Sequence, residues 1–585
     1  RFRNVTGVQT CALPIWAVRR PEWRLVARRT LGEATTTATS LRAATRAKFD
    51  LVPFQLEPVL AMLRGHGCRF LIADAVGLGK TVQAGLMVAE IFARQPGARA
   101  IVIAPAGLRE QWQHELLARF GLHAVVMDAT GVARTASMLP AGLNPWSIHP
   151  LVITSIDYVK RPEVLRCLEP LVWDAVVLDE AHALAGRSDR AAAAAAIAGR
   201  GRCIVMLTAT PHSGDAAGFR RLCDIGRLSD DEPLLLFSRT HADAGGTRRR
   251  TNVARIRPTA AERAMHDALT DYGERVWQCT SSADGAWLAV SVLARRAASS
   301  AASLVLSLDR RIGLLDSPGD AAHAQLGLPF VSGEEEDVEP DWQLQAPGLA
   351  DRDDELARLR QIRELAARAA QSESKLRWIR RLLTRIQEPA IVFTEYRDTL
   401  RHVADALAPV SIAQLHGGLT SRERTDALAA FTAGSARVLI ATDAASEGLN
   451  LHQRCRLVIN LELPWTPLRL EQRAGRVDRI GQRRRVHALH LIASGTSEER
   501  VLLTLARRMS HIRAAMGPLA YAPLPDDGGV AEAVFAGQAL PDIAAVPPDL
   551  TRVRVCSLHD DARLESARIH TARTLLQRSA SRVDS

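Results

Sequence analysis

Residues 74–81 read Asp-Ala-Val-Gly-Leu-Gly-Lys-Thr, directly after a short apolar run and at the start of a helical stretch. In such a turn the backbone N–H groups and the helix N-terminus point at one place, which suits an anionic phosphate. Gly77 and Gly79 would let the backbone approach the phosphates, and Lys80 would reach the β- and γ-phosphates. The Thr81 hydroxyl would ligate Mg²⁺. The run therefore predicts a phosphate loop that binds a nucleotide.

Two carboxylates, Asp179 and Glu180, follow the apolar run 176–178, about 100 residues after the loop. Parallel α/β sheets present ligand-binding residues at the carboxyl ends of their strands. Asp179 would hold Mg²⁺ through water, and Glu180 would polarise the attacking water. Alone, the pair could be a helix N-cap, and the loop, with Asp74 in place of its first glycine, could be a purely structural turn. Together they predict phosphate chemistry, so we keep Asp74 among the nucleotide-binding residues.

A third element, residues 471–482, reads Glu-Gln-Arg-Ala-Gly-Arg-Val-Asp-Arg-Ile-Gly-Gln. On a helix, Arg476 and Arg479 are neighbours on one face. Phosphoryl transfer needs cations on the γ-phosphate as charge develops, a contribution of about 10³ to 10⁵ in rate. In isolation the segment could be a solvated basic helix. Following the other two motifs, it predicts arginines that complete a nucleotide site shared between two domains.

The elements that must position these residues form two similar regions. In each, short β-rich apolar runs alternate with helical stretches, which predicts parallel sheets flanked by helices at residues 45–245 and 371–515. The intervening residues 246–370 read as a helical insertion or linker, with helices over 261–276, 287–315 and 352–371. The expected strands are 70–73, 100–104, 151–154, 175–178 and 203–207, then 390–393, 438–441, 457–461 and 486–491.

The remaining segments flank these regions. Residues 1–44 form an N-terminal segment, in which residues 3–15 resemble a translated sequencing adapter and are set aside as non-native. Residues 516–585 read as a linker and a final helix over about 560–578. That helix runs nearly to the last residue, so we expect the chain to be cut from a longer protein.

Composition bounds the class of protein. The chain has 585 residues, 47% hydrophobic, with a net charge of +11, which fits a polyanionic partner and equally an arginine-rich genome. Its eight cysteines form no Cys-x-x-Cys pair, which favours free thiols in a reducing cytoplasm. No apolar run approaches the roughly 20 residues that cross a bilayer, so we expect no membrane contact.

At this point the ordered motifs resemble superfamily two helicases. The resemblance rests on the three elements above and on five further runs: Pro-Phe-Gln at 53–55, Leu-Thr-Ala-Thr-Pro at 207–211, Phe-Thr-Glu-Tyr at 393–396, Leu-His-Gly-Gly at 415–418 and residues 441–450. Asp74, the Gly-Leu-Gly-Lys-Thr run and Arg-Val-Asp-Arg-Ile-Gly-Gln resemble the Swi/Snf-type branch. Residues 153–157 and 463–465 are similar to bacterial RNA polymerase-associated ATPases and phage-defence helicases. Ala75 stands where this family usually has glutamate.

The resemblance implies further roles. Gln55 would read the adenine edge, and Asp443 and Gly448 would face the nucleotide from the second domain. Residues that couple nucleotide state to the nucleic acid would be Thr208, Thr210 and Gln472. The nucleic-acid track would consist of Pro105, Gln111, Trp112, Ser155, Thr394, His416, Gly417 and Thr442, since small hydroxyls and backbone amides bind phosphates without reading bases. Trp112 and Trp465 could equally be core residues.

The sequence thus predicts two RecA-like P-loop NTPase domains with a helical insertion between them, an enzyme that hydrolyses Mg²⁺-bound ATP. The resemblance implies translocation on double-stranded DNA and remodelling of protein–DNA complexes, in the bacterial cytoplasm and nucleoid, with RNA polymerase or defence-system proteins as partners. Strand separation of DNA or RNA is one alternative. A catalytically dead nucleic-acid-binding scaffold is the other, and the presence of Lys80, Asp179, Glu180, Arg476 and Arg479 argues against it.

Overall fold

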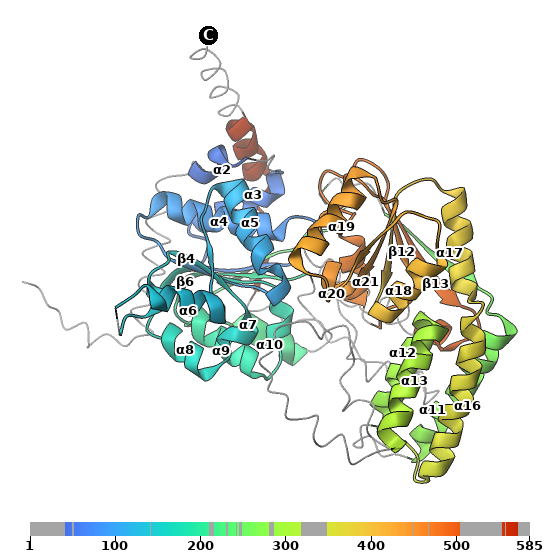
Figure 1. Cartoon of the computed structure of the whole chain (residues 1–585). Coiled ribbons are helices and arrows are strands. Elements are labelled where there is room, and N and C mark those ends of the chain that lie inside the picture. The colour runs from blue at the N-terminus through green and yellow to red at the C-terminus, as the bar shows by residue number, and fades with distance from the viewer. Residues whose placement is uncertain are drawn as a thin grey trace, which may run out of the picture.

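The computed structural model describes residues 41–48, 52–140, 142–209, 216–229, 232–241, 243–244, 249–279, 286–316, 348–446, 449–465, 467–502, 553–555 and 557–570. It contains two α/β domains side by side and a group of long helices packed beside the second (Figure 1). Thr210 and Gly448 lie outside the described residues, as do the N-terminal residues 3–15.

The first domain is built on an eight-stranded sheet with the order β14-β7-β1-β6-β5-β2-β4-β3, parallel throughout. Its strands are almost continuous apolar runs, as expected where helices cover both faces of a parallel sheet. They are β1 (Arg69–Ile72), β2 (Ala100–Ile103), β3 (Val125–Val126), β4 (Leu151–Thr154), β5 (Trp173–Leu178), β6 (Gly201–Leu207), β7 (Leu234–Phe237) and β14 (Val553–Val555).

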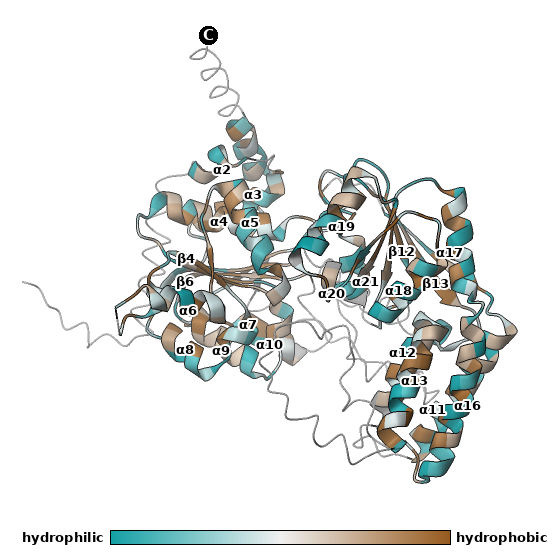
Figure 2. Ribbon diagram, viewed as in Figure 1, coloured by the Kyte–Doolittle hydropathy of each residue, from teal (hydrophilic) through white to brown (hydrophobic). Residues whose placement is uncertain are grey.

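Two hydrophobic cores lie on opposite faces of this sheet. Alternate residues of one strand feed them, so Phe70 and Ile72 join one core and Leu71 joins the other. The covering helices are α2 (Arg42–Arg46), α3 (Pro53–Leu63), α4 (Lys80–Arg94), α5 (Arg109–Phe120), α6 (Ala129–Ser137), α7 (Ile156–Val159), α8 (Pro162–Leu168), α9 (Asp189–Ala198) and α10 (Ala216–Asp224). Figure 2 shows the apolar strands enclosed by helices whose outer faces are more hydrophilic.

The second domain has a six-stranded parallel sheet with the order β10-β11-β9-β12-β13-β8. Its strands are β8 (Arg250–Ile256), β9 (Ala390–Thr394), β10 (Ile412–Leu415), β11 (Val438–Thr442), β12 (Leu457–Asn460) and β13 (His487–Ala493). Its helices are α17 (Ser374–Arg385), α18 (Arg397–Ala406), α19 (Ser421–Ala433), α20 (Asp443–Ser446) and α21 (Pro467–Ala474). The predicted fold class, two α/β domains with parallel sheets, is confirmed.

The long helices come from the segment between the two domains. They are α11 (Ala260–Cys279), α12 (Ala286–Ser299), α13 (Ala301–Asp316) and α16 (Arg352–Ala370), and they share one apolar core that also contains Trp465. Inside it, Arg311 and Glu355 form a buried ion pair of 2.5 Å, and the Tyr272 hydroxyl donates to the same carboxylate at 2.7 Å. Trp465 is therefore a core residue, the second of the two readings left open for it.

Several elements differ from the expectations. β3, β7 and β10 were not among the expected strands, although they lie within the two regions expected to be α/β domains. β8 lies within the segment expected to be purely helical, yet it pairs with β13 along seven residues and belongs to the second sheet. β14 lies in the segment expected to be a linker and a helix, yet it extends the first sheet beside β7. The helix expected over 287–315 is two helices, interrupted at Ser300. The described part of the predicted C-terminal helix, residues 559–570, is helical.

Candidate nucleotide cleft between the two domains

Residues of both domains line one cavity of about 660 Å³, a size typical of small-molecule sites. The first domain contributes Gln55, Val76, Gly77, Gly79, Lys80, Thr81, Val82, Pro105, Leu108, Gln111, Trp112, Glu115, Arg119, Asp179, Glu180, His182 and Ala209. The second contributes Asn450, His452, Gln453, Gln472, Arg476, Arg479 and Ile480. The three sequence motifs, namely the loop at 74–81, the acidic pair at 179–180 and the arginine-bearing segment at 471–482, therefore meet in one cavity.

The phosphate loop connects β1 to α4. Gly77 and Gly79 have positive φ angles of 89° and 81°, a region that only glycine adopts without strain. α4 begins at Lys80, so its N-terminal N–H groups face the cavity. Lys80 Nζ donates a 2.9 Å hydrogen bond to the Asp74 carbonyl, and burial lowers the pKa of this amine. The lysine is thus folded back along the loop, within the wall of the cavity.

The acidic pair follows β5 directly. Asp179 accepts a 2.8 Å hydrogen bond from Trp112 Nε1 and a 2.9 Å hydrogen bond from the Glu180 N–H. Burial raises the pKa of Asp179 to about 6, and the negative charge of Glu180 adds to this shift. Glu180 has a φ of 47°, the left-handed region that non-glycine residues rarely adopt. Such strain concentrates at functional sites, where the surrounding structure enforces it.

His182 connects the acidic pair to the next motif. Its Nδ1 lies 3.3 Å from Glu180 Oε2 and 3.3 Å from Thr208 Oγ1. Thr208 is fully buried at the end of β6, where its N–H donates to Ile72 O of the neighbouring strand. A change at Glu180 would therefore reach Thr208 through one imidazole, which suits the coupling role expected of Thr208.

The arginines approach the loop from the second domain. Arg479 Nε donates to Gly475 O at 2.8 Å, which directs the side chain along the cavity wall. Burial lowers its pKa to about 10, with the charge of Arg476 as the next cause, so it remains protonated at neutral pH. The two domains touch here, because the Ile480 N–H donates to Gly77 O at 3.4 Å. A Cβ on Gly77 would lie 2.3 Å from Asp478 O, so this approach requires glycine.

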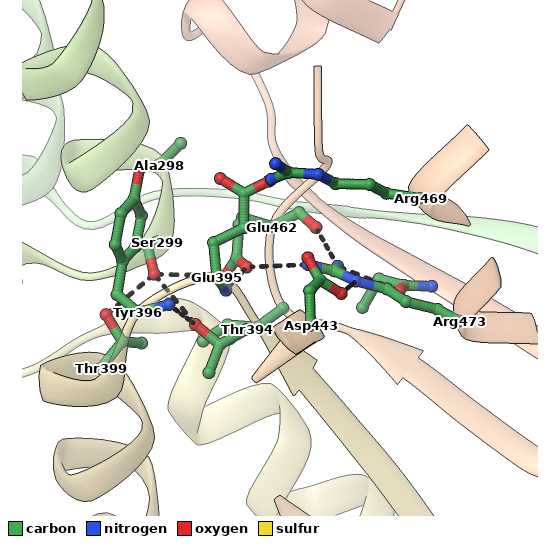
Figure 3. A network of polar contacts seen from close by, with 12 residues as sticks. Ala298, Ser299, Thr394, Glu395, Tyr396, Thr399, Asp443, Glu462, Arg469 and Arg473 are labelled. Carbon is green, nitrogen blue, oxygen red and sulfur yellow. Dashed lines mark hydrogen bonds and ion pairs between the residues drawn. The ribbon is translucent and has the colours of Figure 1, made fainter. Parts of the chain in front are cut away.

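A buried network of polar contacts in the second domain holds the segment that carries Arg476 and Arg479 (Figure 3). Arg473 binds both carboxylate oxygens of Asp443, at 2.6 and 2.7 Å. Its Nη2 also lies 3.6 Å from Glu462 Oε1. Burial raises the pKa of Glu462 to about 7. The Ser299 hydroxyl at the end of α12 lies 3.2 Å from Glu462 Oε2 and 3.3 Å from Thr394 Oγ1, which attaches the helical insertion to the second domain.

Two of the expected site residues have side-chain partners within the protein. Asp443 is held bidentately by Arg473 and is not among the residues that line the cavity. Trp112 is 1% exposed, and its indole packs in the core while donating to Asp179. The sequence could not show these partners, since Arg473 is 30 positions from Asp443 and Asp179 is 67 positions from Trp112. Asp443 is thus a structural partner of Arg473, and Trp112, a core residue at the cavity wall, supports the acidic pair through its indole N–H.

Gln55 lies in the cavity wall, but both ends of its amide already bind backbone. Its Oε1 accepts from the Val52 N–H and its Nε2 donates to Leu78 O, each at 3.2 Å. The amide thus ties α3 to the phosphate loop, and reading adenine would require it to use its remaining hydrogen-bonding capacity.

The structure divides the expected track residues. Pro105 and Gln111 line the cavity, where Gln111 Oε1 is buried with no hydrogen-bond partner among the described residues. Ser155, Thr394, His416 and Thr442 are largely buried at the ends of their strands, and Gly417 is exposed. The Ser155 hydroxyl accepts the Tyr158 N–H and so caps α7. Gln472 lies in the cavity wall beside the arginines.

Several residues of this region were missing from the sequence prediction. Arg473 and Glu462 form the support in Figure 3; Arg473 lies within the motif at 471–482, and Glu462 directly precedes the run at 463–465. Asn450, His452 and Gln453 line the second-domain wall; Asn450 ends the motif at 441–450, and the other two follow it. Their position in or beside these motifs was the signal for them, and their contacts depend on how distant strands meet.

The side chains present fit Mg²⁺. This ion keeps several waters and binds through one or two protein oxygens together with substrate phosphates. Thr81 and Asp179 supply a hydroxyl and a carboxylate to the same cavity. Among the described residues no group of three or more His, Cys, Asp or Glu could hold a metal by itself. None of the described helices is both long and apolar enough to span a bilayer.

Comparison with known proteins supports the same arrangement. Residues 52–227 match the model of the SNF2-related domain, and residues 374–481 match that of the helicase conserved C-terminal domain. The chain is 26% identical over 501 residues to the uncharacterized ATP-dependent helicase YqhH of Bacillus subtilis, covering 80% of each. It is 28% identical over 480 residues to the RNA polymerase-associated protein RapA of Yersinia enterocolitica, covering 75% of this chain.

The chain spans about half (47%) of the length of that RapA protein, and the same share of its Yersinia pseudotuberculosis counterpart. Among solved structures, the Pyrococcus furiosus Hef helicase domain is similar, with 16% identity and a TM-score of 0.47, covering 75% of this chain and 95% of that one. With both domain models matched in order, the chain is an ATP-hydrolysing member of the Swi/Snf-type branch of helicase superfamily two.

Proposed function

We propose that this helicase is a translocase on double-stranded DNA that uses ATP hydrolysis to remodel protein–DNA complexes. The observation that carries the proposal is the shared cavity, in which Lys80 and Glu180 of one domain lie opposite Arg479 of the other. A nucleotide bound there would contact both domains. Its binding and hydrolysis would therefore change how the domains sit relative to each other, which is the movement that a translocase needs.

Each side chain in the cavity has a task in this proposal. Lys80 and the first N–H groups of α4 bind the β- and γ-phosphates. Glu180 orients and polarises the attacking water, and His182 holds its carboxylate. Arg476 and Arg479 stabilise the charge that develops on the γ-phosphate. Mg²⁺ held by Thr81 and Asp179 would neutralise the phosphate oxygens and so lower the barrier further.

Nucleic acid would lie across both domains. Gly417 and Arg422 are exposed on the second domain, and Arg109 and Lys160 are at least partly exposed on the first. Contacts of this kind recognise the backbone of DNA, so affinity should fall steeply with salt, with a slope of about −0.9 per phosphate neutralised on a duplex. RNA polymerase or defence-system proteins would be the partners displaced or recruited, in the cytoplasm at the nucleoid. The RNA polymerase-associated relatives support the first of these partners.

ATPase assays with duplex DNA, single-stranded DNA and RNA test the proposal, together with triplex-displacement and strand-displacement assays. We expect duplex DNA to stimulate hydrolysis most, and triplex displacement to exceed duplex unwinding. Efficient unwinding with preference for single strands would instead establish a strand-separating helicase. If the chain did not hydrolyse ATP with any of these nucleic acids, it would instead be a scaffold that binds nucleic acid without catalysis.

A further inference from the structure

The first position of the phosphate loop, where the strict motif has glycine, is occupied by a buried aspartate. Asp74 occupies the first position of the loop and is 0% exposed. Burial raises the pKa of this carboxyl, and the nearby charge of Arg239 is the strongest influence in the opposite direction. A carboxylate taken out of water is costly unless it is paired and hydrogen-bonded. The loop therefore needs a partner for Asp74 in order to keep its shape.

Two side chains bind the Asp74 carboxylate. Gln83 Nε2 of α4 donates to Oδ2 at 2.7 Å. Arg239 Nη1 donates to both carboxylate oxygens at 3.2 Å. The carbonyl of the same aspartate accepts the hydrogen bond from Lys80 Nζ, so Asp74 lies between Arg239 and the lysine that is to bind phosphate.

Arg239 is itself rigidly held. It follows β7, the strand beside β1, and its carbonyl accepts the Ala75 N–H of the phosphate loop at 2.9 Å. Its guanidinium packs over the rings of Phe54 and Phe237, 5.5 and 5.2 Å from their centroids. Both the backbone and the side chain of this one residue thus contact the loop, although it lies 165 positions from Asp74 in sequence.

Arg239 also lies 3.0 Å from Glu57 on α3, which offers a competing explanation for its presence. Glu57 has other support, because its Oε2 accepts the Leu558 N–H at 3.0 Å and its Oε1 lies 3.8 Å from His559 Nδ1. Among the described residues, Arg239 and Lys80 are the cations near Asp74, and Lys80 bonds only to its carbonyl. Loss of Arg239 would therefore leave Asp74 less compensated than Glu57.

We propose that Arg239 is a positioning residue for ATP binding, which offsets the charge of Asp74 and holds the loop so that Lys80 and the α4 N-terminus meet the phosphates. The proposal rests on the assignment of residues 74–81 as the ATP site. Arginine suits the task because its planar guanidinium presents Nη1 to both oxygens of Asp74 while Nη2 lies beside Glu57, whereas lysine offers a single point charge. Arg239 acts through Asp74 and does not touch the nucleotide.

Equilibrium binding of a fluorescent Mg·ATP analogue to the full chain tests this role, alongside kcat and KM for ATP at saturating DNA. The variants are Arg239→Met and Arg239→Lys, then Arg239→Met combined with Asp74→Asn, and Arg239→Met combined with Glu57→Gln. We expect Arg239→Met to raise the Kd and KM about tenfold or more, with a smaller effect on kcat. Arg239→Lys should recover only part of this loss.

Removal of the Asp74 charge should restore most of the affinity lost in Arg239→Met, and removal of the Glu57 charge should not. Rescue by Glu57→Gln in place of Asp74→Asn would overturn the proposal, because Arg239 would then act on α3. Wild-type affinity in folded Arg239→Met would also overturn it. If Arg239→Met does not fold, as judged by its melting curve, the double variant with Asp74→Asn decides: folding with restored binding supports the proposal, and failure to fold refutes it.

Lys80→Ala in the same binding assay separates this inference from the proposed site. If Lys80→Ala bound Mg·ATP like the wild type, residues 74–81 would not be the phosphate loop and both would fail. If Lys80→Ala lost binding while Arg239→Met kept it, the site would stand and the role of Arg239 would be wrong.

Discussion

Replacement of Arg479 with alanine tests whether the second domain takes part in hydrolysis. The side chain reaches across the cleft, since its Cγ would lie 3.0 Å from a Cβ on Gly77. Among the described residues, the Arg479 guanidinium donates one hydrogen bond, from Nε to Gly475 O. The two Nη groups are therefore available to a phosphate. Its pKa of about 10 keeps it charged at neutral pH. The group is thus placed and charged as a catalytic arginine should be.

The magnitude follows from this position. An arginine that stabilises a developing γ-phosphate charge contributes about 10³ to 10⁵ in rate. We therefore expect Arg479→Ala to lower kcat by about 10³-fold or more, equivalent to roughly 4 kcal/mol at 1.36 kcal/mol per decade. Lys80 and the α4 N-terminus remain, so the Kd for Mg·ATP should change little. Arg479→Lys should rescue little, because a point charge cannot reproduce the planar fork.

Steady-state ATPase measurements at saturating ATP and DNA provide the assay, with DNA binding measured in parallel. Arg484→Ala is a matched control, since Arg484 is an exposed arginine of the same segment that does not line the cavity. DNA should still bind Arg479→Ala without accelerating hydrolysis. If Arg479→Ala turned over normally at saturating DNA and only bound DNA more weakly, like the control, the residue would be part of a basic surface and the shared site would be refuted.

Three further variants probe the cleft and its support. Glu180→Gln should bind Mg·ATP but lower kcat by about 10²-fold or more, seen in single-turnover assays, because water activation is lost while the metal ligands remain. Gly77→Ala should reduce kcat about tenfold or more, because its Cβ would meet Asp478 O at 2.3 Å, whereas Gly97→Ala, with a similar φ and open space, should not. Glu462→Gln should make the free energy of unfolding less dependent on pH. The folded protein raises the pKa of Glu462 to about 7, so the wild type holds this proton more tightly than the unfolded chain does. Its stability therefore falls as pH rises from about 4.5 through 7, by up to about 1.4 kcal/mol per pH unit. Urea midpoints at several pH values measure this, and parallel curves for the two proteins would contradict it.

The sequence predicted the parts of the fold that depend on local pattern. Central strands such as β5 and β11 are apolar along their whole length, because helices cover both sides of the sheet, and each was expected within a few residues. β8 was not expected, because it lies at the edge of the sheet and only its last residue is buried, the others being exposed or half-buried. β14 was missed because three residues carry no usable periodicity.

The same division applies to the site. Motifs within one turn, such as residues 74–81, could be interpreted because their chemistry depends on neighbours in sequence. The partners of Trp112, Asp443 and Asp74 could not, since each is set by strands that meet only in the folded sheet. Trp112 shows the consequence, because the sequence left it as either a track residue or a core residue, and only the fold shows that its indole N–H donates to Asp179.

Trp112, Arg239 and Arg473 each stabilise charged groups that the fold gathers at or beside the cleft. The cleft gathers Asp179, Glu180 and Lys80 on one side and two arginines on the other, so each domain must hold like charges close together and partly out of water. Neighbouring side chains offset part of that unfavourable free energy: Trp112 donates to Asp179, and Arg239 offsets the charge of Asp74. On the second domain, the Arg473–Asp443 pair fixes the segment that presents Arg476 and Arg479. A nucleotide with its negative phosphates would then be the missing counter-charge between the two halves, which makes closure favourable when ATP is bound and less favourable once its γ-phosphate has left.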